Sequence, residues 1–382
     1  MSLCLCGNIT AFVNREIETK TERIIQLVSR EDLGGVLLNA QHNFAWITGG
    51  ASNGIDLSRE NGVASIFVRR DGKRFLLANN IEMPRMLAEE VSADEFEPVE
   101  FSWQDEKTAG DLLVAKARSL ADREIATDLP IHQSTTAIES KLAPCRFELT
   151  EEEIDRFRKL GIDAGKSVRD AIGKISPGQS EIEIAATMQA ELAMRNIISV
   201  VTLVAADERI KDFRHPIPTE NRWRRTLLLV TCAKRHGLIV NLSRMVCVGK
   251  VPAELQEKTE ATAFVNATLW NATRPGATGA ELYRIAAEAY SNVGFADEIN
   301  LHHQGGAAGY KTREWVAHPK SVEVVEANQA FAWNPSVSGT KVEETMIVMG
   351  EGIEVITASP DFPVMATSID GREYLSPGIL SV

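Results

Sequence analysis

Long apolar runs are missing from this chain of 382 residues. No run of about 18 apolar residues occurs, so the sequence predicts no membrane-spanning helix and no membrane partner. The first residues also lack a basic segment followed by a long apolar one, which predicts no secretory leader. We therefore expect a cytoplasmic protein.

Cysteines are few, and the five present are scattered along the chain. An odd, scattered set without a secretory leader is typical of reduced thiols rather than of a disulfide framework. Cys4 and Cys6 have no second pair that would complete a zinc site, so we expect no metal there.

An excess of basic charge is also lacking, because 41 Lys and Arg face 53 Asp and Glu, for a net charge of −12. Acidic residues occur in both halves, and no basic tail or face is evident, so we expect no nucleic-acid partner. The short basic cluster of Arg214, Arg222, Arg224 and Arg225 predicts a solvated rim or an anion-binding edge.

The first 148 residues alternate between helical and strand-like patterns, which predicts a compact α/β domain. Helical spacing occurs at residues 13–33, 81–91, 106–121 and 134–142. Strand-like runs occur at residues 35–39, 43–47, 63–68, 74–78, 96–101 and 124–127.

The remaining residues, 149–382, contain two similar helical units. Thr150 followed by three glutamates predicts the start of a helix that runs to Ile175. Pro177-Gly178 follows that helix, and Pro275-Gly276 follows another ninety-eight residues later. Strand-like runs come after each unit, so we expect a duplicated α+β domain with a curved antiparallel sheet covered by helices.

A glycine-rich loop with two histidines, residues 300–310, stands near the end of the second unit. Glycines let a backbone approach a neighbour closely, and imidazoles bind metals or move protons. The alternative is a loop between two core elements in which a histidine only satisfies hydrogen bonds.

These features together resemble the creatinase, prolidase and methionine aminopeptidase superfamily, whose catalytic domain has the pita-bread fold. Residues 39–49, with Asn39, Trp46 and Thr48-Gly49, are similar to the signature of the N-terminal domain in the creatinase, prolidase and aminopeptidase P branch. The resemblance implies an N-terminal α/β domain at 1–148 and a pita-bread α+β domain with an internal pseudo-twofold at 149–382.

Peptidases of this superfamily usually hold two divalent metals with two Asp, one His and two Glu, whose carboxylates bridge hard cations. The resemblance places these five ligands at Thr231 (or Val230, depending on one gap), Asn241, His303, Asn334 and Glu343.

Three of these five positions therefore lack a carboxylate. We expect no cofactor, or at most one loosely bound divalent metal at His303 and Glu343. Asn241 and Asn334 have nearly the shape of the lost acids but donate as well as accept hydrogen bonds. They would bind a polar ligand, or they reflect drift in a dead site.

The resemblance also implies roles for the site residues. His215 matches the substrate-side histidine and would act as general base, with His303 as acid or oxyanion partner and Glu343 beside them. The alternative for His215 is a turn histidine packed on Trp223. His302 is interpreted as a neighbour of the ligand position, not a ligand. The expected substrate-binding residues are Thr231, Asn241, Asn334, Tyr310 and Arg313.

The resemblance implies a hydrolase of the Xaa-Pro peptidase or creatinase type, acting on a small amide or dipeptide-like substrate. The alternative is a non-catalytic protein of the same fold that binds a small molecule or peptide. A homodimer is expected from the family, with Trp46, Ile47, Ile55 and Leu57 as apolar surface.

Overall fold

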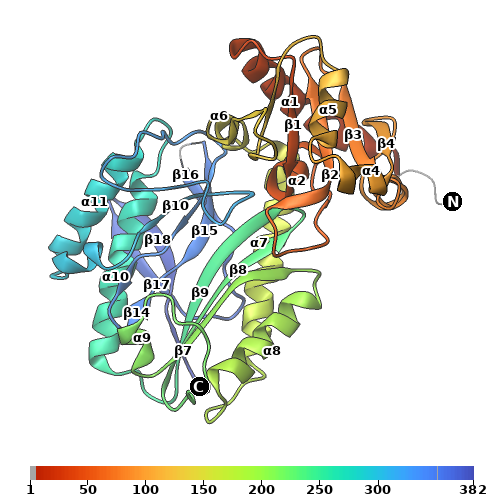
Figure 1. Ribbon diagram of the computed structural model, residues 1–382. Coiled ribbons are helices and arrows are strands. Elements are labelled where there is room, and N and C mark those ends of the chain that lie inside the picture. The colour runs from red at the N-terminus through yellow and green to blue at the C-terminus, as the bar shows by residue number, and fades with distance from the viewer. Residues whose placement is uncertain (1–5, 351) are drawn as a thin grey trace. The chain divides into compact units, whose positions relative to one another are not determined.

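The computed structural model describes residues 6–350 and 352–382, with side chains from residue 15 onward, so the Cys4 and Cys6 thiols lie outside the described part (Figure 1). The chain divides into two compact units, Met1–Arg146 and Phe147–Val382. This division lies two residues before the boundary that the sequence predicts. None of the described helices is long and apolar enough to cross a membrane.

The N-terminal unit is built on a six-stranded mixed sheet in the order β4-β3-β2-β1-β5-β6. Its strands are β1 (Gly35–Ala40), β2 (Asn61–Arg69), β3 (Arg74–Asn79), β4 (Glu97–Phe101), β5 (Ile125–Thr127) and β6 (Thr136–Ala137). Its helices are α1 (Cys6–Arg30), α2 (Gln41–Ile47), α3 (Met83–Arg85), the π-helix η1 (Met86–Glu90), α4 (Trp103–Thr108), α5 (Leu112–Ser119), α6 (Glu139–Leu142) and the 3-10 helix η2 (Ala143–Arg146). A cluster that includes Leu37, Phe67 and Phe75 forms a core between sheet and helices, so the predicted α/β class is confirmed.

Residues 43–47 form part of helix α2, so the predicted strand there is wrong. A run of five residues, four of them apolar, is too short for periodicity to distinguish a strand from a buried helix. Trp46 and Ile47 are fully buried in this helix and cannot form the expected exposed surface, whereas Ile55 and Leu57 are 59% and 62% exposed.

The C-terminal unit repeats one helical motif. Helix α7 (Glu151–Ile172) begins with a capping box between Thr150 and Glu153, and α8 (Glu181–Ala193) begins with another at Ser180. The second copy comprises α10 (Ala253–Ala272) and α11 (Gly279–Asn292), capped by Thr278.

The two Pro-Gly turns are equivalent in geometry, since Gly178 and Gly276 have φ angles of 97° and 94°. The Gly178 N–H donates to the carbonyl oxygen of Trp223, and the Gly276 N–H donates to that of Val325. These matched turns confirm the predicted internal duplication.

Two sheets follow these helical pairs. The first, in the order β19-β9-β8-β7, contains β7 (Ile198–Ala206), β8 (Thr226–Arg235), β9 (Leu238–Cys247) and β19 (Ile379–Ser381). The second, in the order β11-β10-β12-β15-β16, contains β10 (Gly305–Ala308), β11 (Trp315–Val316), β12 (Ala330–Trp333), β15 (Glu344–Met349) and β16 (Gly352–Val355). The shorter elements are α9 (Arg209–Asp212), the 3-10 helix η3 (Ala296–Asn300), and the hairpins of β13 (Ser336–Val337) with β14 (Thr340–Lys341) and β17 (Val364–Ile369) with β18 (Arg372–Pro377).

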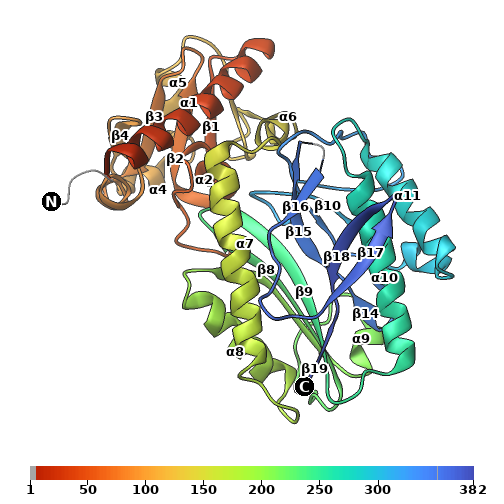
Figure 2. The same ribbon diagram turned by 180° about the vertical axis from the view of Figure 1, so that it is seen from behind.

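The two sheets meet where β9 approaches β15. The Asn241 N–H donates to Thr345 Oγ1 over 2.7 Å, and that hydroxyl donates back to the Asn241 carbonyl oxygen over 2.9 Å. Figure 2 views this unit from the side on which α7, α8 and α10 lie. The strands and this covering layer of helices form the predicted pita-bread architecture.

The glycines of the histidine loop permit strand β10 to pack closely. A Cβ atom at Gly305, where φ is 102°, would lie 2.2 Å from the Ala332 carbonyl oxygen. A Cβ atom at Gly306 would lie 2.1 Å from the Trp315 carbonyl oxygen. The neighbouring backbone thus occupies the space that a side chain would need, so only glycine fits at these two positions.

Gly305→Ala is expected to lower the free energy of unfolding by about 3 kcal/mol or more, because it adds a backbone clash to a strained φ. Gly276→Ala is the matched control, since its φ is 94° but no atom lies within 4 Å of the added Cβ. That control is expected to cost only about 1 kcal/mol. Equal losses for the two variants in urea denaturation would contradict the packing argument.

Candidate active site

Two loops of the C-terminal unit carry the histidines. His215 lies between α9 and β8, and His302 and His303 lie between η3 and β10. Arg214 joins the two loops by an ion pair with Glu298 of η3. The Arg214 guanidinium also donates to Ser336 Oγ and Ser338 Oγ over 3.1 and 2.9 Å. The residue beside His215 thus anchors its loop.

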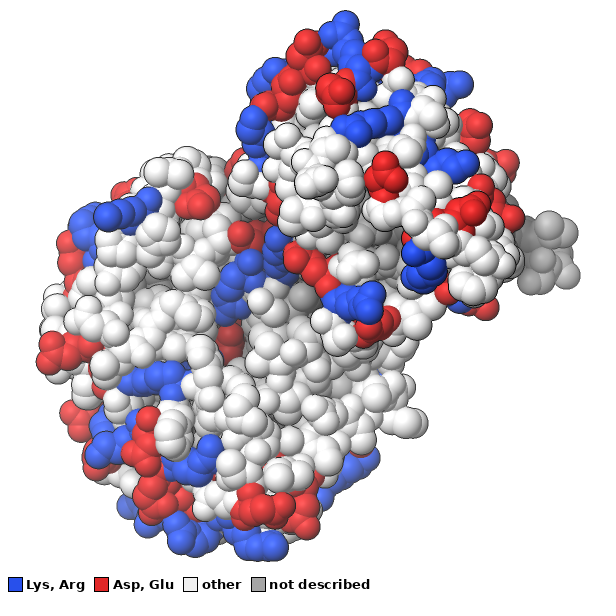
Figure 3. All heavy atoms as spheres, viewed as in Figure 1, with Lys and Arg blue, Asp and Glu red and all other residues white. Residues whose placement is uncertain are grey.

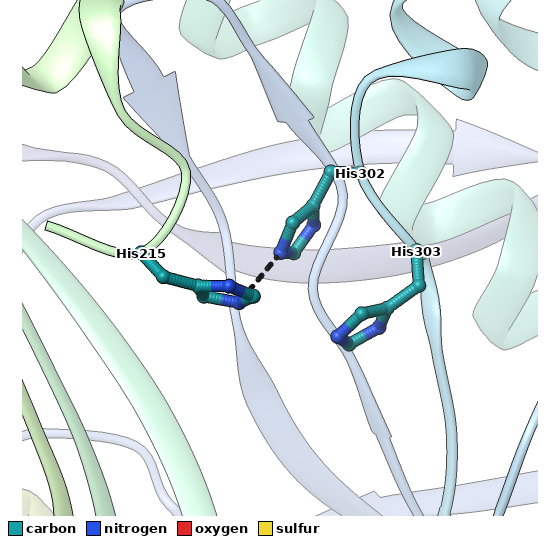
Figure 4. A group of neighbouring side chains, drawn as sticks. All are labelled: His215, His302 and His303. Carbon is teal, nitrogen blue, oxygen red and sulfur yellow. Dashed lines mark hydrogen bonds between the residues drawn. The ribbon is translucent and has the colours of Figure 1, made fainter.

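The three imidazoles gather in one cluster (Figure 4). His215 Nε2 and His302 Nε2 form a hydrogen bond of 3.1 Å. The ring centroids of His215 and His303 are 6.0 Å apart, and the nearly parallel rings of His302 and His303 are 4.5 Å apart. The structure therefore brings together the two predicted histidines and adds His302, which the sequence analysis had set aside.

A buried hydrogen-bond chain holds the second loop. The Tyr290 hydroxyl donates to Gln304 Oε1 over 2.7 Å and accepts from the Ser336 N–H over 2.9 Å. Gln304 Nε2 in turn donates to the His302 carbonyl oxygen over 2.5 Å. Burial raises the pKa of Tyr290, so its hydroxyl keeps its proton at neutral pH.

All three histidines are neutral near pH 7. Burial, together with the charge of Lys341, lowers the pKa of His302 to about 2 and the pKa of His215 below its ordinary value. Burial and the charges of Arg313 and Lys341 lower the pKa of His303 to about 4. Neutral imidazoles accept protons, so the cluster is suited to base chemistry.

Glu343 lies just before β15 and is buried between two cations. Its carboxylate is 3.1 Å from Arg313 Nη2 and 3.3 Å from Lys341 Nζ. Burial alone would raise its pKa, but Lys341 and Arg313 together hold the pKa of Glu343 below its usual value. Glu343 is therefore ionised, and the three residues carry one net positive charge.

The register of the β8–β9 hairpin separates two predicted site residues. Asn241 pairs with Cys232 across the hairpin, while Thr231 pairs with Leu242. Because side chains alternate between faces, Thr231 points away from the face of Asn241, and its hydroxyl bonds to Ser199 Oγ over 2.8 Å. Thr231 therefore does not share the face of Asn241, whereas Val230, the other alignment, does.

Cys232 is a neighbour of the site that the sequence analysis missed. It shares the face of Asn241 and is buried. Burial and the charge of Glu343 raise the pKa of this thiol to about 12, so it stays protonated. The sequence signal that indicates Cys232 is its position two residues after Val230, because alternate residues of a strand lie on the same face.

Asn241 and Asn334, the two asparagines at predicted ligand positions, are both buried. The Asn334 N–H donates to the Gln304 carbonyl oxygen over 2.9 Å, and Asn241 Nδ2 lies 3.5 Å from the Thr312 carbonyl oxygen. Among the described residues, neither side-chain oxygen has a hydrogen-bond partner. A buried polar atom without a partner is costly, so these oxygens are candidates to contact a bound ligand.

Tyr310 is oriented differently from the prediction. Its hydroxyl donates to Glu153 Oε1 over 2.7 Å, next to the N-terminus of α7. The same Glu153 carboxylate accepts from the Thr150 N–H through its other oxygen. The Tyr310 hydroxyl thus already has a structural partner.

The donor set does not fit two bridged divalent metals. At the predicted ligand positions the β8–β9 hairpin has Asn241 and, on the same face, Val230, and the third position is Asn334, so none of them is a carboxylate. The one remaining carboxylate, Glu343, is already compensated by Arg313 and Lys341. Two side-chain cations therefore occupy the surroundings of the carboxylate that would bridge the metals.

Comparison with known proteins agrees with this fold. Residues 155–356 match the model of metallopeptidase family M24, and residues 20–160 match the creatinase/prolidase N-terminal domain. The chain belongs to metallopeptidase family M24. At three of the five positions where the resemblance places metal ligands, Thr231 (or Val230), Asn241 and Asn334, this chain has no carboxylate.

Individual relatives are distant. The chain is 25% identical over 230 residues to a Xaa-Pro dipeptidase of Pyrococcus furiosus. The aligned region covers 58% of this chain and 66% of the relative, so the chain spans just under two thirds of the relative's length. The solved prolidase of Pyrococcus horikoshii is 19% identical, with a TM-score of 0.73, covering 89% of this chain and 98% of the other. Dipeptidase PepE of Mycobacterium ulcerans is 15% identical, with a TM-score of 0.75, covering 98% and 99%. The two structures support the fold.

Glu343→Gln is expected to destabilise the protein by about 3–5 kcal/mol, because it leaves two buried cations without their counter-charge. The control is Glu354→Gln, whose carboxylate pairs with Arg158 over 2.7 Å where both side chains are more than a third exposed. Loss of an exposed pair is expected to cost about 1 kcal/mol or less. Similar unfolding free energies for the two variants in urea denaturation would refute the importance of the buried cluster.

The pH dependence of stability tests the neutral state of His303. Its pKa is about 4 in the folded protein against 6.5 as the ordinary value, so between these values the unfolded chain binds more protons. The free energy of unfolding should therefore increase as the pH rises from 4 to 6.5, and it should decrease again when the protein is acidified through the same range. His303→Asn cannot be protonated and is expected to lose less stability over that window. Parallel melting curves for wild type and variant from pH 4 to 7 would show that His303 is unperturbed.

Proposed function

We propose that this protein hydrolyses a C–N bond in a small amide or dipeptide-like substrate without the two-metal centre of its family. The observation that carries the proposal is the Glu343 carboxylate held by Arg313 and Lys341 beside three neutral histidines. The positive charge that metals supply elsewhere in the family is supplied here by side chains.

In this mechanism His215 acts as the general base. Its imidazole takes a proton from a water molecule, whose oxygen forms a bond to the substrate carbonyl or amidine carbon. The proton then passes from His215 to the leaving nitrogen as the C–N bond breaks. The hydrogen bond of 3.1 Å to His302 orients the His215 ring for both transfers.

His303 fits the role of oxyanion partner better than that of acid. With a pKa of about 4 it is neutral at pH 7, so its N–H is a hydrogen-bond donor rather than a ready proton source. Arg313 and Lys341 add positive charge near the same place, which favours the negative charge that develops on the substrate oxygen. Asn241 and Asn334 would orient the polar groups of the substrate.

The substrate class follows from the family and from the polarity of the site. The curated relatives that match include Xaa-Pro dipeptidases of two Pyrococcus species, which supports a dipeptide-like substrate. On the face shown in Figure 3, basic and acidic side chains are interspersed, which supports the expectation that nucleic acid is not the partner. The homodimer and the cytoplasmic location stay predictions.

The second candidate is a non-catalytic protein that binds a small molecule or peptide in the same site. The loss of three carboxylates from the ligand positions favours it. Under this reading the unpartnered oxygens of Asn241 and Asn334 hold the ligand. Saturable binding without turnover would be its signature.

A substrate screen with chelator-treated protein tests the proposal. Xaa-Pro dipeptides, creatine-like amidines and N-acyl amino acids are supplied with EDTA, and hydrolysis is expected to persist. His215→Ala should reduce kcat by about 100-fold to 10,000-fold, the usual contribution of a general base, with an unchanged melting temperature. His132→Ala, in the N-terminal unit, is the control.

Two results would contradict the metal-free mechanism. Turnover that appears only after addition of Mn²⁺ or Zn²⁺ would restore a metal-dependent reaction. Turnover that survives His215→Ala would assign the base elsewhere. Binding of a screened compound without hydrolysis would support the non-catalytic alternative.

A further inference from the structure

His302 has no part in the proposed reaction beyond its contact with His215. Among the described residues its Nδ1 is buried and has no hydrogen-bond partner. Its ring nevertheless stacks on His303 and bonds to His215. A third imidazole placed so closely against the other two indicates a function for the cluster as a whole.

We infer that His215, His302 and His303 together bind one transition-metal ion of the Zn²⁺ class, and that this ion inhibits the protein by occupying the base. The metal site stands on geometry alone, whereas the inhibition rests on the proposed function. The site differs from the family's carboxylate-bridged centre in its donor atoms and in needing His302.

The distances between the rings suit such an ion after a small movement. Tetrahedral zinc with Zn–N bonds near 2.0–2.1 Å places its nitrogen ligands about 3.3 Å apart. His215 Nε2 and His302 Nε2 are already 3.1 Å apart. One ring nitrogen from each of the three histidines lies within 4.8 Å of the others, so His303 needs to approach by about 1–2 Å.

The surroundings permit that approach. All three histidines lie in loops outside the regular strands, and the His215 and His303 side chains, although partly desolvated by their neighbours, still reach solvent. In Figure 4 the His302 and His303 rings extend the same way from their loop, with His215 facing them from the other loop. Arg214 and Glu298 hold the two loops together, so the three rings do not need to assemble from distant places.

The imidazole nitrogen donors determine which metal ions the site would prefer. Three imidazoles without a carboxylate favour Zn²⁺, Co²⁺, Ni²⁺ or Cu²⁺ over Mg²⁺, Ca²⁺ and Mn²⁺, which prefer oxygen ligands. Glu343 would not complete the set, because Arg313 and Lys341 already contact it. A fourth position would be open to solvent, as at other sites with three protein ligands.

Metal binding and base catalysis exclude each other at His215. Both uses need the lone pair of an unprotonated ring nitrogen, and a nitrogen that coordinates an ion cannot remove a proton from water. Zinc should therefore inhibit the hydrolysis reversibly, and a chelator should restore it.

Cobalt titration of the chelator-treated full chain tests the site without any substrate. Wild type is expected to bind one Co²⁺ per chain with the visible absorption of a tetrahedral complex, and Zn²⁺ should displace it in calorimetry. His302→Ala should weaken binding by more than about 10-fold, since even groups behind the ligands contribute that much. His318→Ala, a histidine of the same unit outside the cluster, should bind as wild type does.

The outcomes separate this inference from the proposed function. The three-histidine site is overturned if wild type fails to bind Co²⁺ or Zn²⁺. It is also overturned if a folded His302→Ala or His302→Gln variant binds with unchanged affinity, which would be expected of an ion held by His303 and Glu343 alone. Binding that leaves turnover unaffected overturns the inhibition. Absence of turnover in the metal-free protein refutes the proposed function, while the cobalt titration still decides the metal site.

Discussion

The ionised Glu343 is the constraint on which the rest of the site depends. A carboxylate buried this deeply is tolerated only with nearby positive charge and hydrogen bonds. Arg313 comes from the segment between β10 and β11, and Lys341 comes from β14. The same cluster therefore ties two separate segments of the second half together, one with Arg313 and one with Lys341 and Glu343, and places a net positive charge beside the histidines.

That positive charge helps to determine the chemistry of the imidazoles. Lys341 adds to burial in lowering the pKa of His215, His302 and His303, which keeps all three neutral. Neutral rings can take a proton or bind a metal ion, but not both at once at the same nitrogen. Catalysis and the inferred zinc inhibition are thus two consequences of one electrostatic arrangement.

Much of the fold follows from local signals in the sequence. The Thr150–Glu153 capping box and the two Pro-Gly turns predict the helix starts and the duplication because their geometry depends on nearby residues alone. Residues 43–47, by contrast, form a helix where the sequence predicts a strand, because a short, mostly apolar run has no period that distinguishes helix from strand.

The site was less predictable, because it depends on register and on long-range pairing. A shift of one residue in the β8–β9 hairpin reverses the face of every side chain, so the sequence alone does not distinguish Thr231, on the opposite face from Asn241, from Val230 and Cys232, which share its face. The pairing of Glu343 with Arg313, thirty residues earlier in the chain, has no local sequence signal. His302 was overlooked because the family pattern has one ligand there, although two adjacent histidines in a glycine-rich loop were visible.

Anomalous diffraction from crystals soaked in Mn²⁺ tests the central claim most directly, because Mn²⁺ favours carboxylate-rich centres over imidazole sites. We expect no anomalous peak between Asn241 and Glu343, with Arg313 and Lys341 still in contact with the Glu343 carboxylate. Two manganese peaks there, with Arg313 and Lys341 displaced, would contradict the substitution of side-chain cations for metals.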